Sequence, residues 1–279
     1  MCYTAPNATS QVTPVSDPST PSHQRAWPFR LGTSSYILPA DILPNVEYLA
    51  PLVDDIELVL FESDEVCNFP DRATVERLRA LAEEFDLTYT VHFPLDLDLG
   101  HPDPEARRRS LDLCLRVRET VALLAPCGYL LHLPGPTDAD RAAWLSRLRE
   151  SLEGLLAAGL PAERLCVETL AYPFAWLAPL LEAYPLSVCL DIGHILLGGY
   201  DLREYLSAYM PRCRVVHLHG ILDGIDHKDL TGLDPADLRA VLQAASAHHP
   251  EDRVVTLEVF SQPDFLASLE VLRGTATRG

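Results

Sequence analysis

The stretch that decides the fold is a short apolar run with a polar end, Leu186-Ser187-Val188-Cys189-Leu190-Asp191-Ile192-Gly193-His194. Three other runs in the C-terminal half end in the same way: Cys166-Val167-Glu168, Val215-Val216-His217-Leu218-His219 and Thr256-Leu257-Glu258. Each run is short and places a carboxylate or an imidazole at the end of a predicted strand. Burying such groups is costly unless a partner offsets their desolvation. A metal ion held at one rim of a barrel is the simplest partner of this kind.

Strand and helix signals alternate from residue 29 onward, which predicts a (β/α)₈ TIM barrel. The alternative, a doubly wound open sheet, usually carries a glycine-rich phosphate turn after its first strand, and Leu31-Gly32-Thr33-Ser34-Ser35-Tyr36 does not supply one. The eight apolar runs begin near Phe29, Ile56, Leu87, Tyr129, Leu165, Ser187, Arg214 and Val254. The amphipathic stretches between and after them span 71–85, 104–124, 138–158, 173–183, 201–208, 235–247 and 263–272.

The N-terminal segment differs in composition from the rest of the chain. Residues 1–27 are rich in Ser, Thr, Pro and Gln without apolar periodicity, so we expect a disordered leader. Residues 28–279 are expected to form a single TIM-barrel catalytic domain. No secretory pattern and no apolar stretch of about 20 residues is present, which favours a cytoplasmic protein without a membrane partner. The seven cysteines form no CxxC pair and are expected to be small buried hydrophobic residues.

The charge balance restricts the class of substrate. The chain has 22 Lys plus Arg against 40 Asp plus Glu, a formal net charge of −18. Nucleic-acid binders usually carry a basic surface that neutralises phosphates. A small-molecule substrate is therefore favoured, and no nucleic-acid partner is expected.

In a barrel the chemistry lies where the strands run into their following loops. Seven of the eight predicted strand ends carry a potential metal ligand, and Tyr36 is the weak eighth. The spacing of two between His217 and His219 places both on one side of a strand, and His217 is favoured as the ligand. In order, the ends present Tyr36, Glu62, His92, His132, Glu168, Asp191 with His194, His217 with His219, and Glu258.

Two acidic segments have competing interpretations. The loop Gly220-Ile221-Leu222-Asp223-Gly224-Ile225-Asp226-His227-Lys228-Asp229 is either a solvated loop or a rim loop. As a rim loop it would lend Asp226 or His227 to a second metal, and Lys228 would meet a phosphate. Asp54, Asp55 and Glu57 begin a strand and are expected to face the opposite rim, where stability or solvation explains them.

Oxygen and imidazole ligands without thiolate suit several divalent ions. The mixed set leans to Mn²⁺, with Zn²⁺ as the second choice. Such an ion could polarise a phosphoryl oxygen and supply hydroxide as nucleophile.

The polar strand ends resemble those of a known superfamily. Glu168, Asp191, His217 and Glu258 look like the metal quartet of xylose-isomerase-like barrels, which include sugar isomerases, epimerases and type-2 AP endonucleases. The additional histidines and the Asp226-His227 loop are similar to the endonuclease branch, which holds several metals and cleaves phosphodiesters. These histidines are His92, His132 and His194.

Residues 29 to 272 resemble more closely the CbiR family of cobamide-remodelling phosphodiesterases. The resemblance implies hydrolysis of the nucleotide-loop phosphodiester of cobamides such as adenosylcobalamin, giving a cobinamide species and an α-ribazole-type product. The segments that carry it are Gly32–Tyr36, Pro39–Val46, Asp54–Glu62, Tyr89–Asp96, Leu190–His194 and His217–Gly220.

The resemblance also implies roles for the site residues. Glu168, Asp191, His217, Glu258, His132 and His194 would bind metal, and Glu168, Glu258 and His219 would act in catalysis. Apart from the resemblance, which assigns no corrinoid-contacting residues, His92, Glu62, His227 and Lys228 are expected to bind the substrate. Two alternatives remain: a sugar (phosphate) isomerase or epimerase that uses one metal with Glu168 and Glu258 as its acid–base pair, and a corrinoid carrier that has lost catalysis.

Overall fold

The computed structural model describes residues 27–60, 69–136, 140–247 and 249–276. Within them, eight parallel strands close into a barrel in the order β1-β10-β7-β6-β5-β4-β3-β2. The predicted TIM barrel is therefore confirmed, and each predicted strand begins close to an observed one. The barrel strands are β1 (Arg30–Ser34), β2 (Asp55–Val59), β3 (Thr88–His92), β4 (Gly128–Leu131), β5 (Leu165–Glu168), β6 (Ser187–Asp191), β7 (Cys213–Leu218) and β10 (Val254–Leu257).

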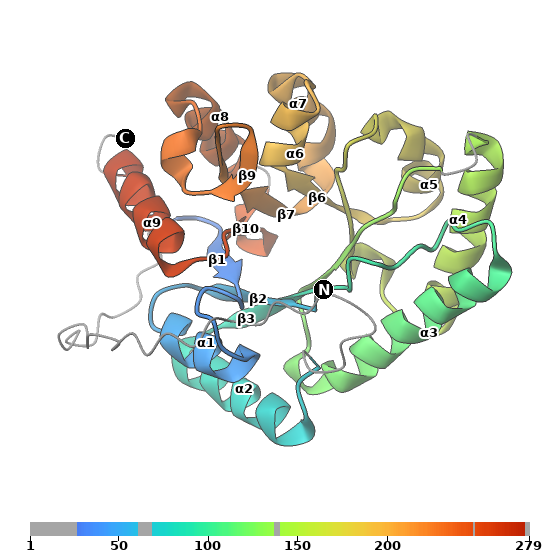
Figure 1. Cartoon of the computed structure of the whole chain (residues 1–279), viewed down its shortest axis with the longest axis horizontal. Coiled ribbons are helices and arrows are strands. Elements are labelled where there is room, and N and C mark those ends of the chain that lie inside the picture. Colours follow the sequence, from blue (N-terminus) through green and yellow to red (C-terminus); the bar gives the residue numbers. More distant parts are fainter. Residues whose placement is uncertain (1–26, 61–68, 137–139, 248, 277–279) are drawn as a thin grey trace.

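Helices surround the barrel on its outside (Figure 1). Asp71 and Asp234 cap the N-terminal ends of two of them, since their carboxylates accept hydrogen bonds from the backbone N–H groups of Thr74 and Ala236 at 2.8 and 2.7 Å. The helices are α1 (Ile42–Leu49), α2 (Arg72–Phe85), α3 (Pro104–Thr120), α4 (Arg141–Ala157), α5 (Ala178–Ala183), α6 (Ile192–Leu197), α7 (Leu202–Tyr209), α8 (Pro235–Ala245) and α9 (Gln262–Ala276).

The sequence patterns missed three elements. Helices α1 and α6 are short, with 8 and 6 residues, so neither offers enough turns for a clear amphipathic period. The third is a hairpin after β7, formed by β8 (Gly220–Leu222) and β9 (Ile225–Lys228). This hairpin matters for the site because it carries Asp226 and His227.

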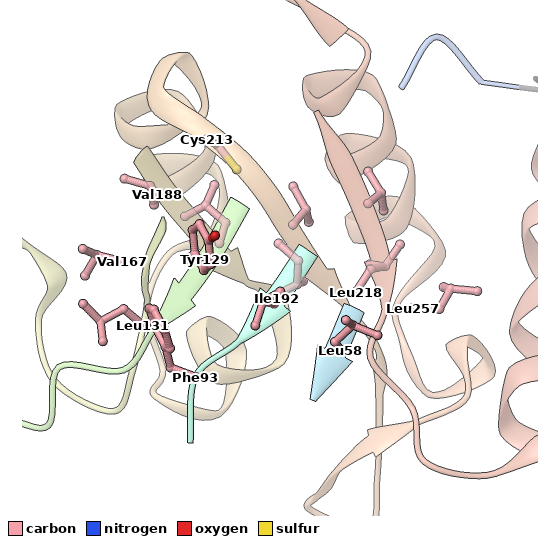
Figure 2. Packing of buried hydrophobic residues seen from close by; sticks show 14 of the residues in the cluster. Leu58, Phe93, Tyr129, Leu131, Val167, Val188, Ile192, Cys213, Leu218 and Leu257 are labelled. Atoms are coloured by element: carbon pink, nitrogen blue, oxygen red, sulfur yellow. The ribbon is translucent and has the colours of Figure 1, made fainter. Parts of the chain in front are cut away.

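Two apolar clusters lie on opposite faces of the barrel wall. The larger one fills the space between strands and helices, and Figure 2 shows part of it, including Leu58, Leu131 and Val167. The smaller cluster consists of Leu130, Cys166, Cys189 and Val215, one residue from each of β4, β5, β6 and β7. Because side chains alternate along a strand, these four point into the barrel, and all are fully buried.

The same alternation positions the polar residues. Two residues beyond each member of this inner cluster stand His132, Glu168, Asp191 and His217. They therefore share the interior face with the apolar layer but lie nearer the C-terminal ends of the strands. The four apolar residues thus form a layer inside the barrel, next to the polar residues and closer to the N-terminal ends of the strands.

The expectation for Asp55 was wrong in one respect. Its side chain is 0 % exposed, so solvation does not explain it. Its carboxylate accepts hydrogen bonds from the hydroxyls of Thr88 and Thr90 at 2.6 and 2.9 Å inside the barrel, near the N-terminal ends of β2 and β3. Burial raises its pKa to about 7 despite these hydrogen bonds.

Two expectations concern the ends and the environment of the chain. The leader 1–27 falls, apart from its last residue, outside the described residues, so its disorder stays a prediction. Among the described residues, no helix combines the length and the apolar character needed to cross a bilayer.

Candidate metal centre

Glu168, at the end of β5, is the carboxylate around which the centre is built. Its side chain is 1 % exposed, and its Oε2 lies 3.3 Å from His92 Nε2, 3.2 Å from His132 Nε2 and 3.6 Å from His217 Nδ1. Its other oxygen, Oε1, lies 3.5 Å from His194 Nδ1. Burial raises the pKa of this carboxyl, but the surrounding imidazoles, His132 and His217 foremost, outweigh burial and hold it well below its usual value.

A second group of ligands is centred on His217. Its Nδ1 lies 3.1 Å from Glu258 Oε2 and 3.7 Å from Asp191 Oδ2, and all three side chains are buried. Glu168 Oε2 lies 3.6 Å from the same Nδ1, so all three carboxylates of the quartet predicted from the sequence lie within 3.7 Å of that nitrogen. This arrangement suits a shared cation, and the role of the four residues as ligands stays a prediction.

The hairpin supplies a third group beside the first two. Asp226 Oδ2 lies 3.9 Å from His194 Nε2 and 3.8 Å from His227 Nε2. His227 has a φ of 52°, the left-handed conformation that β-carbon-bearing residues rarely adopt. It is held there because its backbone N–H donates to His219 Nδ1 at 2.9 Å and its ring lies 3.2 Å from the carbonyl of Glu258.

Unpartnered buried atoms show that these groups suit a metal. Among the described residues, the side-chain atoms His132 Nε2, His217 Nδ1 and Glu258 Oε2 are buried without a hydrogen-bond partner. Groups of potential ligands within 4.8 Å of one another include His92 with His132 and Glu168, and His194 with Asp226 and His227. Unsatisfied buried polar atoms are costly, and a divalent ion would satisfy them.

Cys189 lies beside this centre. It belongs to one potential group with Glu168 and His217. Burial raises the pKa of its thiol well above the usual value, and its side chain belongs to the inner apolar cluster. The other groups named here offer oxygen and imidazole donors, and a set of ligands without thiolate stays a prediction.

The positions of His219 and Gly193 depend on each other. His219 Nε2 lies 3.2 Å from Asp191 Oδ1, and its Nδ1 accepts the N–H of His227, so both ring nitrogens are engaged within the protein. A Cβ at Gly193 would stand 2.0 Å from His219 Cε1, so the glycine gives the ring its place. These contacts make His219 a group that orients Asp191, and its direct catalytic role stays a prediction.

Glu57 is the residue whose placement from sequence was wrong. It was expected to face the opposite rim, but it is 0 % exposed inside the barrel, with its Oε2 3.0 Å from His217 Nε2. The alternation Asp55, Glu57, Val59 along β2 was the signal that could have placed it on the interior face.

The substrate-contact predictions have different outcomes. His92 lies among the potential ligands rather than outside them, with its Nε2 3.3 Å from Glu168 Oε2. His227 and Lys228 lie on β9 at the mouth of the barrel, both half-buried. Glu62 lies outside the described residues.

The strand-to-helix segments at the end of the barrel that carries the centre contain almost no lysine or arginine. The segments joining each barrel strand to the following helix contain one such residue, Lys228, which is also the only lysine of the chain. Arginines cluster instead at the opposite end, where Arg30, Arg212, Arg214 and Arg253 stand at or close to the beginnings of strands. Lys228 is therefore the one lysine or arginine of these segments, and it stands next to His227 in the sequence, while Arg72 and Arg141 begin α2 and α4 at the same end.

The model of the family described as "Xylose isomerase-like TIM barrel" matches residues 53–275. This chain belongs to the xylose isomerase-like TIM barrel family. Among curated proteins it is 32 % identical over 144 residues to "Probable endonuclease 4" of Chloroflexus aurantiacus, covering 46 % of this chain and 50 % of that protein. The corresponding protein of Chloroflexus aggregans is 31 % identical over 147 residues, covering 47 % of this chain and 51 % of that protein. The chain thus spans about half the length of the curated relatives it matches.

Solved structures agree with this fold. Endonuclease IV from Thermus thermophilus superposes with a TM-score of 0.71 at 26 % identity, covering 90 % of this chain and 100 % of that one. A D-tagatose 3-epimerase-like protein gives a TM-score of 0.72 at 17 % identity, covering 88 % and 96 %. IOLI protein, solved with a zinc atom, gives 0.69 at 11 % identity, covering 90 % and 99 %. The last two likenesses concern the fold alone.

Proposed function

We propose that this chain is a divalent-metal-dependent phosphodiesterase that hydrolyses the nucleotide-loop phosphodiester of a cobamide such as adenosylcobalamin. The products are a cobinamide species and an α-ribazole-type product, which permits remodelling of the cobamide. The observation that carries the hydrolytic part is the group of potential ligands around Glu168, His217 and Asp226, with buried donor atoms left unpartnered. The similarity to proteins named endonuclease 4 supports phosphodiester hydrolysis.

Three groups of residues would hold the divalent ions that the proposed hydrolysis needs. Divalent ions, Mn²⁺ as the first choice and Zn²⁺ as the second, would polarise phosphoryl oxygens and lower the pKa of water. His92, His132 and Glu168 would hold one ion, and Glu168 would share a second with the rest of the quartet. His194, Asp226 and His227 form the third potential group.

Other residues of the chain bind and orient the substrate in this proposal. Lys228 at the mouth receives the single phosphate of the substrate, since its ammonium is the only fixed positive charge on the strand-to-helix segments. Glu258, whose Oε2 is buried without a hydrogen-bond partner among the described residues, either binds a cation or accepts a proton at that atom. His219 and Gly193 keep Asp191 in place.

The charge distribution favours a substrate with one phosphate over a polynucleotide. A DNA backbone carries one negative charge per phosphate, and proteins that bind it neutralise several of them with Lys and Arg. The strand-to-helix segments at this mouth supply one such side chain, in a chain with a net charge of −18. A corrinoid that carries a single phosphodiester needs only one positively charged side chain to contact its phosphate.

Exposed apolar side chains at the same end of the barrel suit a bulky substrate. Leu95 follows β3 and is 44 % exposed, while Leu222 and Ile225 on the hairpin are 39 % and 57 % exposed. Exposed large apolar residues near a site often mark a ligand surface. We assign these three to contact with the body of the corrinoid.

The test is direct. Purified protein is incubated with adenosylcobalamin and Mn²⁺, and the products are identified by mass; a cobinamide species and an α-ribazole-type product are expected. Parallel reactions contain a chelator, no metal, or double-stranded DNA with an abasic site in place of the cobamide. Cleavage of the DNA with an intact cobamide would refute the proposed substrate, and full activity after exhaustive chelation would refute the metal.

A sugar (phosphate) isomerase or epimerase is the second candidate, favoured by the acid pair Glu168 and Glu258 beside His217. In such an enzyme the two glutamates exchange a substrate proton. Here both oxygens of Glu168 lie 3.2 to 3.6 Å from imidazole nitrogens, so neither oxygen is free to approach a sugar carbon. A panel of ketoses and their phosphates, followed by chromatography for epimers, decides between the two.

A further inference from the structure

Glu57 on β2 lies beside the metal centre, and the proposed reaction assigns it no role. Its side chain is 0 % exposed, and Oε2 lies 3.0 Å from His217 Nε2 across the barrel interior, since β2 and β7 are not neighbours in the sheet. Strands β1 and β10 lie between them in the sheet, and Ser34 of β1 pairs in register with Glu57. A buried carboxylate with one imidazole partner needs a reason for its position.

The two ring nitrogens of His217 face different surroundings. Nε2 meets Glu57, while Nδ1 faces Glu258 Oε2 at 3.1 Å and Asp191 Oδ2 at 3.7 Å and has no hydrogen-bond partner among the described residues. A neutral imidazole has one N–H and one lone pair. If Nε2 donates its hydrogen to the Glu57 carboxylate, the lone pair resides on Nδ1 and points to the centre.

We propose that Glu57 is a positioning residue that fixes His217 in the tautomer with its lone pair on Nδ1 and so prepares it to bind a divalent ion. A carboxylate that accepts the second N–H of a ligating histidine fixes the ring orientation and increases its basicity. This inference rests on the proposed function only in requiring that the centre binds metal. Substrate identity does not enter it.

Asp55 supplies the matched control. It is a buried carboxylate on the same strand and the same face, two residues before Glu57. Its hydrogen bonds go to Thr88 and Thr90 rather than to His217. Replacing it removes an acid of the barrel interior without removing a partner of the imidazole.

The first experiment measures Zn²⁺ affinity by competition with a chromophoric chelator. The full-length chain is compared with its Glu57→Gln, Glu57→Met and Asp55→Asn variants. We expect the affinity to fall about 10-fold in Glu57→Gln and up to about 100-fold in Glu57→Met, and to change by less than about threefold in Asp55→Asn. An unchanged affinity in folded Glu57→Met overturns the inference.

The second experiment needs no variant to establish the tautomer. Long-range ¹H–¹⁵N spectra of the Zn²⁺-loaded wild-type protein, labelled at histidine, should show His217 protonated at Nε2. Protonation at Nδ1 in the wild type overturns the inference even if a variant fails to fold. Loss of metal affinity in Glu57→Met together with no cobamide hydrolysis by the wild type would leave this inference intact and reject the proposed substrate.

Discussion

Glu168 has an oxygen within 3.6 Å of each of four histidines, and this position makes it the residue on which the centre most depends. Its neighbours come from β3, α6, β7 and the residue after β4, so one side chain joins four parts of the barrel. A carboxamide of the same shape would keep the packing but carry no charge. The electrostatic reason for four imidazoles to converge would then be gone.

We therefore predict that Glu168→Gln lowers turnover by about 100-fold or more, because loss of a residue that merely supports a ligand already costs about 10- to 100-fold. Bound metal, measured by elemental analysis, should fall in parallel. The free energy of unfolding should change by no more than about 2 kcal/mol. The exposed substitution Glu182→Gln is the control, and full turnover in Glu168→Gln would contradict the assignment of the centre.

Asp55 yields a prediction about pH. Its pKa is raised from 3.8 to about 7 by burial, so the folded state keeps a proton that the unfolded chain releases above about pH 4. The stabilising effect of that proton is complete below about pH 4 and is lost as pH rises to about 7. A shift of this size corresponds to roughly 4 kcal/mol.

Asp55→Asn should accordingly flatten this part of the stability profile. Relative to the wild type, the variant should gain free energy of unfolding between about pH 5 and about pH 8, as measured by urea denaturation of metal-free protein at both values. A constant difference between the two proteins across this range would show that Asp55 titrates normally.

At the scale of elements, the junction of β6 and α6 joins helix capping to the centre. Asp191 is both the last residue of β6 and the N-cap of α6, since its Oδ1 accepts the N–H of His194 at 2.6 Å. Gly193 then allows His219 to approach Asp191. One turn of chain thus fixes the directions of Asp191, His194 and His219 together.

Gly193→Ala should displace His219, because the new methyl group would stand 2.0 Å from its Cε1. We expect a loss of about 1–3 kcal/mol in the free energy of unfolding, the range typical of overpacking, and weaker metal binding. Gly274→Ala in α9 is the control, since an added Cβ there meets nothing within 4 Å. Thermal unfolding and chelator competition measure both effects.

The elements that the sequence predicted well are those with a strong local period. Eight buried strands and the polar residues at their ends follow from apolar runs and from alternation along each strand. The apolar pattern predicts a loop where the hairpin β8–β9 is observed, although Asp223-Gly224, both with positive φ, is a typical two-residue hairpin turn. Alternation along β2 predicts an interior position for Glu57, but its contact with His217 lies across the barrel, and contacts between non-adjacent strands leave no local pattern.

At the scale of the whole molecule, the segments at the two ends of the barrel differ in charge. The strand-to-helix segments around the centre contain one lysine and no arginine, while Arg30, Arg212, Arg214 and Arg253 stand at or close to the strand beginnings at the opposite end. Long-range attraction of a polyanion to this mouth is therefore weak, in contrast to a protein that neutralises many phosphates. The family fold is compatible with either arrangement, so this distribution is a property of this chain.

We predict a weak salt dependence. Between about 50 and about 500 mM NaCl, kcat/KM for a cobamide should fall by no more than about tenfold, because at most one phosphate contact is screened. Heparin, used as a competing polyanion, should not inhibit. A decrease of several orders of magnitude over this range would indicate that the mouth binds a polyphosphate.

The solitary lysine at the mouth gives the chain a practical property. Apart from the α-amino group, Lys228 is the one primary amine available to acylating reagents. A fluorophore attached there would stand next to His227 and report on binding at the metal centre without any engineered cysteine.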